Sequence, residues 1–175
     1  MDRRPERSEA KDYCWKYIDR VQDGDICAAL ERLGRETVDF LRTISDAQSL
    51  HRYAEDKWSI REAAGHVNDC ERLFLGRAFW FARGFTSELP SFDQEVAVAA
   101  AGAHEQPWGS LIDEFSSVRA ATLSFFRGLP EDAWTKSGIA SGNPFTVRAL
   151  AYLIAGHADY HNEILRDRYL ASARS

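Results

Sequence analysis

The sequence has no uninterrupted run of the roughly 20 apolar residues that a membrane span needs. Its first five residues, Met-Asp-Arg-Arg-Pro, also lack the apolar region of a secretory signal peptide. The three cysteines are widely spaced and form no Cys-x-x-Cys pair, so we expect free thiols in a reducing compartment. These absences argue against a membrane protein and predict a cytoplasmic location.

An excess of basic residues is also missing. The 175 residues include 27 acidic and 22 basic side chains, which gives a formal net charge of −5. A protein that binds nucleic acid as its main ligand normally presents a basic face to the phosphates. We therefore expect a small-molecule substrate and no nucleic-acid partner.

The composition is that of an ordinary globular protein, with 45% hydrophobic and 28% charged residues. The length allows one domain with a substantial core and is short for two. Residues 1–10 are mostly charged and polar, and they are expected to form a flexible leader. Residues 11–175 are expected to form a single domain, which begins with a short aromatic segment over residues 12–18.

Apolar residues at helical spacing predict four long amphipathic helices. Asp25 is the expected N-cap of the first, which extends to about Ile44. Ser59 and Glu62 form a capping box that starts the second helix, and Gly84 ends it. The third covers residues 108–127, and the fourth runs from the N-cap Thr146 to about residue 170.

The connections complete the expected fold. Residues 45–57 are a polar turn region, and residues 137–144 are a loop rich in glycine, serine and asparagine. The long connection over residues 85–107 contains an alanine-rich helical piece, residues 92–102, between two prolines. No convincing alternating strand pattern is present, so we predict an all-α four-helix bundle with a crossover connection and short extra helices.

Two histidines, His157 and His161, lie four residues apart within the apolar stripe of the fourth helix. This spacing places both rings on one face, one turn apart. Burying two neutral imidazoles without partners is costly, so either polar groups on neighbouring helices or a cation should satisfy them. The spacing alone leaves both interpretations open.

His66 is the other histidine on the inner face of a predicted helix, and it completes a possible three-histidine set. Three imidazoles and one open position are the ligand count of a catalytic zinc site, and imidazole also suits nickel, copper or iron. Cys70, one turn after His66, could add a soft ligand, but a small buried side chain is the simpler interpretation. His51 and His104 fall in loops and are expected to be solvated.

Charged residues on the second and third helices have two interpretations. Asp69 lies one turn after His66 and could orient a ligand ring or act as a catalytic base. Arg77 could hold an anionic group. An ion-pair network between helices is the alternative for all of them, and we favour it for Glu71, Arg77, Glu114 and Arg119.

A set of motifs gives the chain a resemblance to the DinB/YfiT-like superfamily of four-helix bundles. The match extends over residues 13–169, and the motifs are residues 57–62 (Lys-Trp-Ser-Ile-Arg-Glu), 65–72 (Gly-His-Val-Asn-Asp-Cys-Glu-Arg), Arg77, 82–84 (Ala-Arg-Gly), 155–157 (Ala-Gly-His) and His161. In that family one histidine of the second helix and a His-x3-His pair of the last long helix bind a divalent metal, usually zinc or nickel. The resemblance therefore implies that His66, His157 and His161 are metal ligands.

The family includes thiol transferases that use low-molecular-weight thiols such as mycothiol or bacillithiol, a mycothiol-dependent isomerase and metal-dependent hydrolases. The resemblance thus implies a metal-dependent hydrolase or a thiol transferase with a thiol cosubstrate. The alternative is a non-enzymatic, stress-related module that binds a small molecule and keeps a metal for stability or sensing. Abundant aromatic side chains, including Trp15 and Trp80, are compatible with a homodimer.

Overall fold

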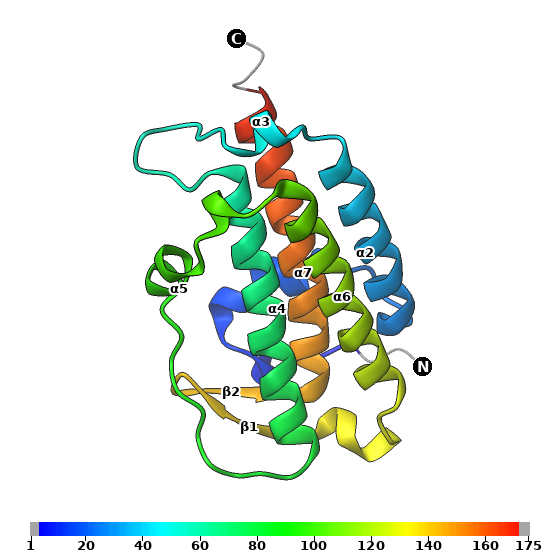
Figure 1. The fold of residues 1–175 in the computed structure, drawn as a ribbon. Helices are drawn as coiled ribbons and strands as arrows, with labels where there is room; N and C mark the ends of the chain where they lie inside the picture. Colours follow the sequence, from blue (N-terminus) through cyan, green and yellow to red (C-terminus); the bar gives the residue numbers. More distant parts are fainter. Residues whose placement is uncertain (1–3, 172–175) are drawn as a thin grey trace.

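Four long helices pack side by side in the computed structural model, which describes residues 4–171 (Figure 1). They are α2 (Ile26–Arg42), α4 (Ile60–Ala82), α6 (Trp108–Arg127) and α7 (Val147–Ile164). α4 packs against α6 and α7, and α2 packs against the same two helices from the other side. The predicted all-α bundle is therefore confirmed.

The helix directions explain the long connection. α4 and α6 run the same way, whereas α2 and α7 run the opposite way (Figure 1). The chain must return along the full length of the bundle between α4 and α6, and it does so through residues 83–107. The expected crossover is confirmed, and it carries α5 (Gln94–Ala101) beside α4.

Shorter elements fill the ends and one side of the bundle. They are the 3₁₀ helices η1 (Arg7–Glu9), η2 (Asp12–Cys14), η3 (Ala103–Glu105) and η4 (Glu131–Thr135), the α-helices α1 (Trp15–Ile18) and α3 (Asp46–Ser49), the strands β1 (Ser137–Ala140) and β2 (Asn143–Thr146), and the π-helix η5 (Leu165–Leu170). α1 packs on α7 and places the predicted aromatic segment against the bundle.

The predicted helix starts are confirmed by their hydrogen bonds. The Asp25 carboxylate accepts from the backbone N–H groups of Cys27 and Ala28. The hydroxyl of Ser59 accepts from the N–H of Glu62, whose carboxylate accepts from the N–H of Ser59. These side chains satisfy helix N–H groups that have no partner within the helix, so each helix begins at a defined residue.

The prediction of a loop over residues 137–144 is wrong, because most of this segment belongs to an antiparallel hairpin. Ser137 pairs with Thr146, and Ala140 pairs with Asn143. Ser141 and Gly142 form the turn with φ values of 54° and 69°, and positive φ at both positions fits the right-handed twist of a hairpin. Each strand has only four residues, too few for an alternating pattern to stand out from the turn residues.

The described part of the leader is attached to the bundle. The Glu9 carboxylate accepts hydrogen bonds at 2.7 Å from Thr146 Oγ1 and from Arg148 Nε. Arg4 and Arg7 both form ion pairs with Asp19. Residues 4–10 therefore lie against the folded chain, while residues 1–3 fall outside the described residues.

α7 lies in the core of the bundle, and this helix determines where its two histidines lie. All residues from Ala149 to Ala158 are buried.

Among residues 4–171, no helix combines the length and the apolar character that crossing a membrane requires.

Candidate metal centre

Three histidine side chains meet where α4 faces α7. His66 comes from α4, and His157 and His161 come from successive turns of α7. The ring centroids lie 5.2 Å apart for His66 and His157, 5.0 Å for His66 and His161, and 4.5 Å for His157 and His161. One nitrogen from each ring can be chosen so that all three lie within 4.8 Å of one another. The structure thus brings together the three histidines that the sequence grouped.

The donor set fits a divalent cation. Two metal–nitrogen bonds of about 2 Å span at most about 4 Å, so small ring rotations would bring the nitrogens onto one ion. No hydrogen bond links His157 or His161 to another residue in the described part of the chain. Their ring nitrogens are therefore available as ligands.

Burial keeps the three imidazoles neutral. It lowers the pKa of His66 to about 4, with a smaller opposing effect from the Glu95 carboxylate. It lowers the pKa of His161 to about 3, helped by His66 and the Lys16 ammonium, and it lowers the pKa of His157 as well. A metal ligand must be unprotonated, and these rings meet that condition at neutral pH.

Aromatic rings fix the orientation of the cluster. The Tyr17 ring of α1 stands nearly edge-on to His157, with centroids 5.1 Å apart. The Trp58 ring, just before α4, lies 4.8 Å from the His66 ring. The sequence does not identify Tyr17 as a neighbour of the site, because Tyr17 is far from the histidines in the chain and no spacing pattern links them.

Cys70 contacts His66 without joining the ligand cluster. Its Sγ lies 3.6 Å from Nε2 and 3.7 Å from Nδ1 of the His66 ring, so it is directed at neither nitrogen in particular. Burial raises the pKa of the Cys70 thiol to about 12. All three cysteines are free thiols, as expected.

The histidine cluster borders two cavities. The first, of about 270 Å³, is lined by His66 and His157 together with Arg77 and several aromatic side chains. The second, of about 260 Å³, is lined by His161, Trp58 and Glu95. A ligand in either cavity would contact at least one of the histidines.

Asp69, the candidate base, lies on another side of α4. It lines a separate hollow with Gly65 and Glu114 and forms a 3.5 Å ion pair with Arg72. Burial raises its pKa, and so does Glu114, against the opposite effect of Arg72. Two carboxylates, Asp56 and Glu95, line the cavity that His161 also lines. Asp56 forms a 2.6 Å ion pair with Lys57, whereas Glu95 accepts a 3.2 Å hydrogen bond from Trp58 Nε1.

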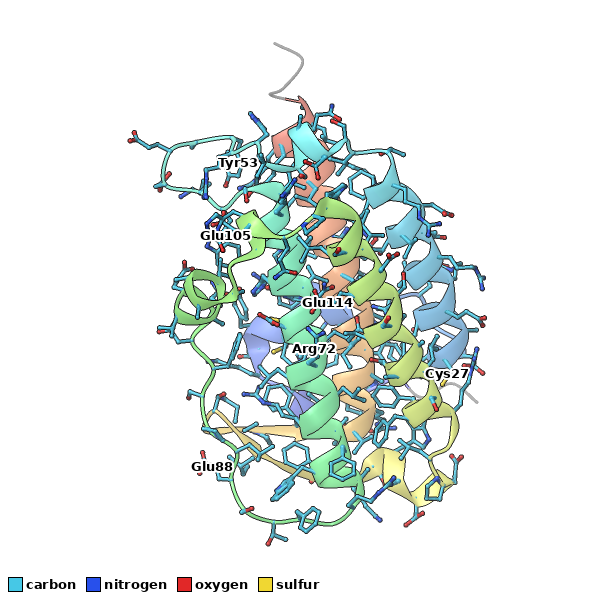
Figure 2. The ribbon with its side chains drawn as sticks, in the orientation of Figure 1. Cys27, Tyr53, Arg72, Glu88, Glu105 and Glu114 are labelled. Carbon is cyan, nitrogen blue, oxygen red and sulfur yellow. The ribbon has the colours of Figure 1, made fainter. Side chains whose placement is uncertain are left out.

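The expected ion-pair network is confirmed for three of its four residues. Both oxygens of the buried Glu71 accept from Arg119, at 2.7 and 2.8 Å. Glu114 forms a 2.6 Å ion pair with Arg72, and Figure 2 shows these two side chains between α4 and α6. The prediction is wrong for Arg77, which joins no ion pair within residues 4–171.

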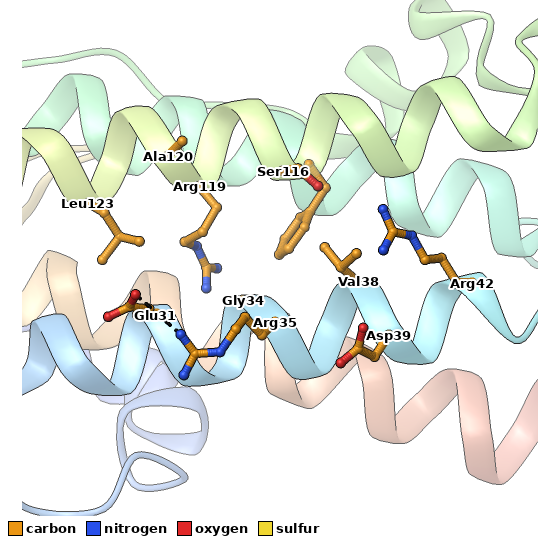
Figure 3. A pocket seen from close by; sticks show the side chains of 11 residues that line it. Glu31, Gly34, Arg35, Val38, Asp39, Arg42, Ser116, Arg119, Ala120 and Leu123 are labelled. Atoms are coloured by element: carbon orange, nitrogen blue, oxygen red, sulfur yellow. Dashed lines mark ion pairs between the residues drawn. The ribbon is translucent and has the colours of Figure 1, made fainter.

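A larger cavity of about 390 Å³ lies away from the histidines, between α2 and α6 (Figure 3). Arg119 reaches across it from α6 toward Gly34 of α2. A Cβ atom at Gly34 would lie 2.9 Å from Arg119 Cγ, so the glycine makes room for this side chain. Arg119 also donates to the Leu30 carbonyl at 2.8 Å, which indicates a structural role.

The sequence matches the profile of the DinB superfamily over residues 29–165. This match includes the three clustered histidines and more than half of the chain. The protein belongs to the DinB superfamily. No curated protein matches its sequence.

Two solved structures have the same fold as this DinB-superfamily protein. YfiT from Bacillus subtilis, described as a probable metal-dependent hydrolase with an unusual four-helix bundle topology, matches with a TM-score of 0.70 and 15% identity, over 97% of this chain and 91% of YfiT. A mycothiol-dependent maleylpyruvate isomerase matches with a TM-score of 0.68 and 13% identity, over 85% of this chain and 65% of the isomerase. At these identities the likeness establishes the fold alone.

Proposed function

We propose that this protein is a metal-dependent enzyme in which His66, His157 and His161 hold a zinc or nickel ion. The observation that carries the proposal is the convergence of three neutral imidazoles, two of them buried and that of His161 partly buried, whose ligand atoms lie within 4.8 Å of one another. A divalent ion held by three imidazoles is a Lewis acid that lowers the pKa of water or of a thiol at neutral pH. The reaction is therefore hydrolysis or the transfer of a low-molecular-weight thiol to a small molecule.

Residues around the histidines would protect and orient the site. Tyr17 covers His157 and Trp58 covers His66, which limits the access of water to those rings. For proton transfer we favour Glu95 over Asp69, because Glu95 lines the cavity that contains His161 and Asp69 does not. If Glu95 is the base, replacing it by glutamine should lower kcat by about 100-fold or more, whereas Asp69→Asn should change it little.

Metal content tests the proposal directly. Protein purified without an affinity tag or a chelator is expected to contain, or to take up, about one zinc or nickel ion per chain in elemental analysis. His66→Ala, His157→Ala and His161→Ala should each reduce this stoichiometry. His104→Ala is the matched control, because His104 is exposed and lies outside the cluster. Protein that neither contains nor takes up these metals would refute the proposal.

Activity separates an enzyme from a binding module. The metal-loaded protein should be screened for thiol transfer with several low-molecular-weight thiols and for ester hydrolysis. We expect His157→Ala to abolish the activity that is found. If that variant kept full activity and only melted at a lower temperature, the metal would be structural and the non-enzymatic alternative would be correct.

A further inference from the structure

Arg77 is a buried cation that forms no ion pair with any described residue. It is 6% exposed and lines the 270 Å³ cavity together with His66 and His157. Its Nη2 donates to the Pro90 carbonyl at 3.1 Å and to Ser141 Oγ at 2.9 Å. Its Nε is buried without a hydrogen-bond partner, and no carboxylate within residues 4–171 pairs with the guanidinium.

The other buried arginines show how unusual this arrangement is. Arg119 binds both oxygens of Glu71, and Arg61 forms a 2.7 Å ion pair with Asp46. A guanidinium keeps its charge inside a protein, and an unpaired buried charge is costly. Burial lowers the pKa of Arg77, and Cys14 and Cys70 act in the opposite direction. Residues 4–171 therefore leave this charge without a counter-ion.

The walls of the cavity indicate what kind of molecule could supply one. Apolar and aromatic side chains surround the space between Arg77 and the histidines, namely Leu73, Phe74, Phe92, Phe145 and Leu153. The Cα atoms of His66 and Arg77 are eleven residues apart on α4, which is about 16 Å along the helix axis. Long side chains on a helix lean back toward its N-terminus, so the Arg77 side chain shortens the gap that a ligand must span. A ligand that reaches both ends must be elongated and largely apolar.

We propose that this cavity binds an elongated carboxylic acid with an apolar body, whose carboxylate pairs with Arg77 and whose other end approaches His66 and His157. This inference rests on the proposed function only for the chemistry at the histidine end of the ligand, and the pairing of its carboxylate with Arg77 does not depend on it. A carboxylate matches the single charge of one guanidinium, whereas a phosphate ester would bring a second negative charge into the cavity. The other cation among the lining residues is Lys11, which is exposed.

Calorimetric titration with matched probes tests the proposal, because it needs no enzymatic activity. The probes are 4-phenylbutanoate, its neutral amide 4-phenylbutanamide, and phenyl phosphate, each added to metal-free and to zinc-loaded protein. We expect the acid to bind at least about tenfold more tightly than the amide, as a charge-assisted hydrogen bond implies. This preference should persist in the metal-free protein, so a failure to bind metal would refute the proposed function and leave the preference for the acid intact.

Variants assign the preference to Arg77. Arg77→Met should weaken binding of the acid at least about tenfold and leave binding of the amide unchanged, and Arg77→Lys should fall between. Arg83→Met is the matched control, since it removes an equal charge from an exposed position at the end of the same helix. If Arg77→Met does not fold, Arg77→Lys and the comparison of acid with amide in the unaltered protein still test whether the carboxylate pairs with Arg77. Equal binding of acid and amide, no effect of the variants, tighter binding of phenyl phosphate, or no binding of any probe would overturn the proposal.

Discussion

The backbone of Tyr17 lies directly against Gly156, the residue before the first histidine of α7. A Cβ atom at position 156 would overlap the carbonyl oxygen of Tyr17. This close approach of α1 to α7 also places the Tyr17 ring beside His157. A glycine in the middle of an apolar helix is therefore explained by packing, and this packing forms one wall of the histidine site.

Gly156→Ala is expected to destabilise the protein, because a backbone oxygen cannot move aside as a side chain could. Overpacking of this kind typically costs about 1–3 kcal/mol, and a clash with backbone belongs at the upper end. Denaturation by urea measures the loss of unfolding free energy. Gly76→Ala is the matched control: Gly76 is exposed on α4 with no atom within 4 Å of its Cβ position, so alanine should stabilise by about 0.5–1 kcal/mol. Equal effects of the two substitutions would contradict this account.

The buried pair of Glu71 and Arg119 makes a second prediction. Removing one partner leaves the other charge buried and unpaired, so Glu71→Met and Arg119→Met should each cost about 3–5 kcal/mol of unfolding free energy. The double variant Glu71→Met with Arg119→Met should cost clearly less than the sum, because neither charge remains. A double-mutant cycle measured by denaturation checks this.

An exposed pair is the control for that cycle. Arg32 and Glu36 lie one turn apart on the surface of α2, with their closest atoms 3.0 Å apart. Such pairs contribute about 0.3–0.5 kcal/mol, so Arg32→Ala should change stability little. A strictly additive cycle for Glu71 and Arg119 would show that the two side chains do not depend on each other.

Much of the fold could be predicted because its signals are local. The caps at Asp25, Ser59 and Thr146 and the apolar periodicity between them depend on residues within a few positions of one another. The hairpin was missed because its strands are too short for a period to be recognised. α3 was missed although Ser45 and Gln48 form a capping box that was visible in the sequence.

The candidate site could be predicted only in part, for a related reason. The spacing of His157 and His161 places them on one face of a helix, and that local argument was sufficient for these two residues. Tyr17 and Glu95 reach the site from segments far away in the chain, and only the packing of α1 and α5 on the bundle brings them there. The isolated glycine at position 156 was the one local sign of such a close contact.

The carboxylate of Glu9 makes stability depend on pH. Burial alone would raise its pKa, but the hydrogen bonds from Arg148 and Thr146 hold it below the ordinary value of 4.5. A depressed pKa means that the charged form stabilises the fold above pH 4.5 and that this contribution is lost as the pH falls through the folded-state pKa. Stability should therefore decrease below about pH 4.5 by this route.

Glu9→Gln removes that part of the pH dependence. The variant should be less stable by about 1–2 kcal/mol at pH 7, because hydrogen bonds to a charged acceptor are lost, and it should differ less from the unaltered protein near pH 3. Glu55→Gln is the control, since Glu55 is exposed and has no hydrogen bond to a described residue. A constant difference between the Glu9 variant and the unaltered protein from pH 7 to pH 3 would contradict the prediction.

Cobalt substitution can show which side chains bind the metal. Because Cys70 Sγ is nearly equidistant from both nitrogens of His66 and lies outside the ligand cluster, we expect the sulfur to stay unbound. Protein loaded with Co²⁺ should then lack the near-ultraviolet charge-transfer absorption of a thiolate ligand. Cys70→Ser should leave the stoichiometry and the visible spectrum unchanged, whereas His161→Ala should alter both. A thiolate band that disappears in Cys70→Ser would instead make the sulfur a fourth ligand, close the open coordination position and favour a structural metal over a catalytic one.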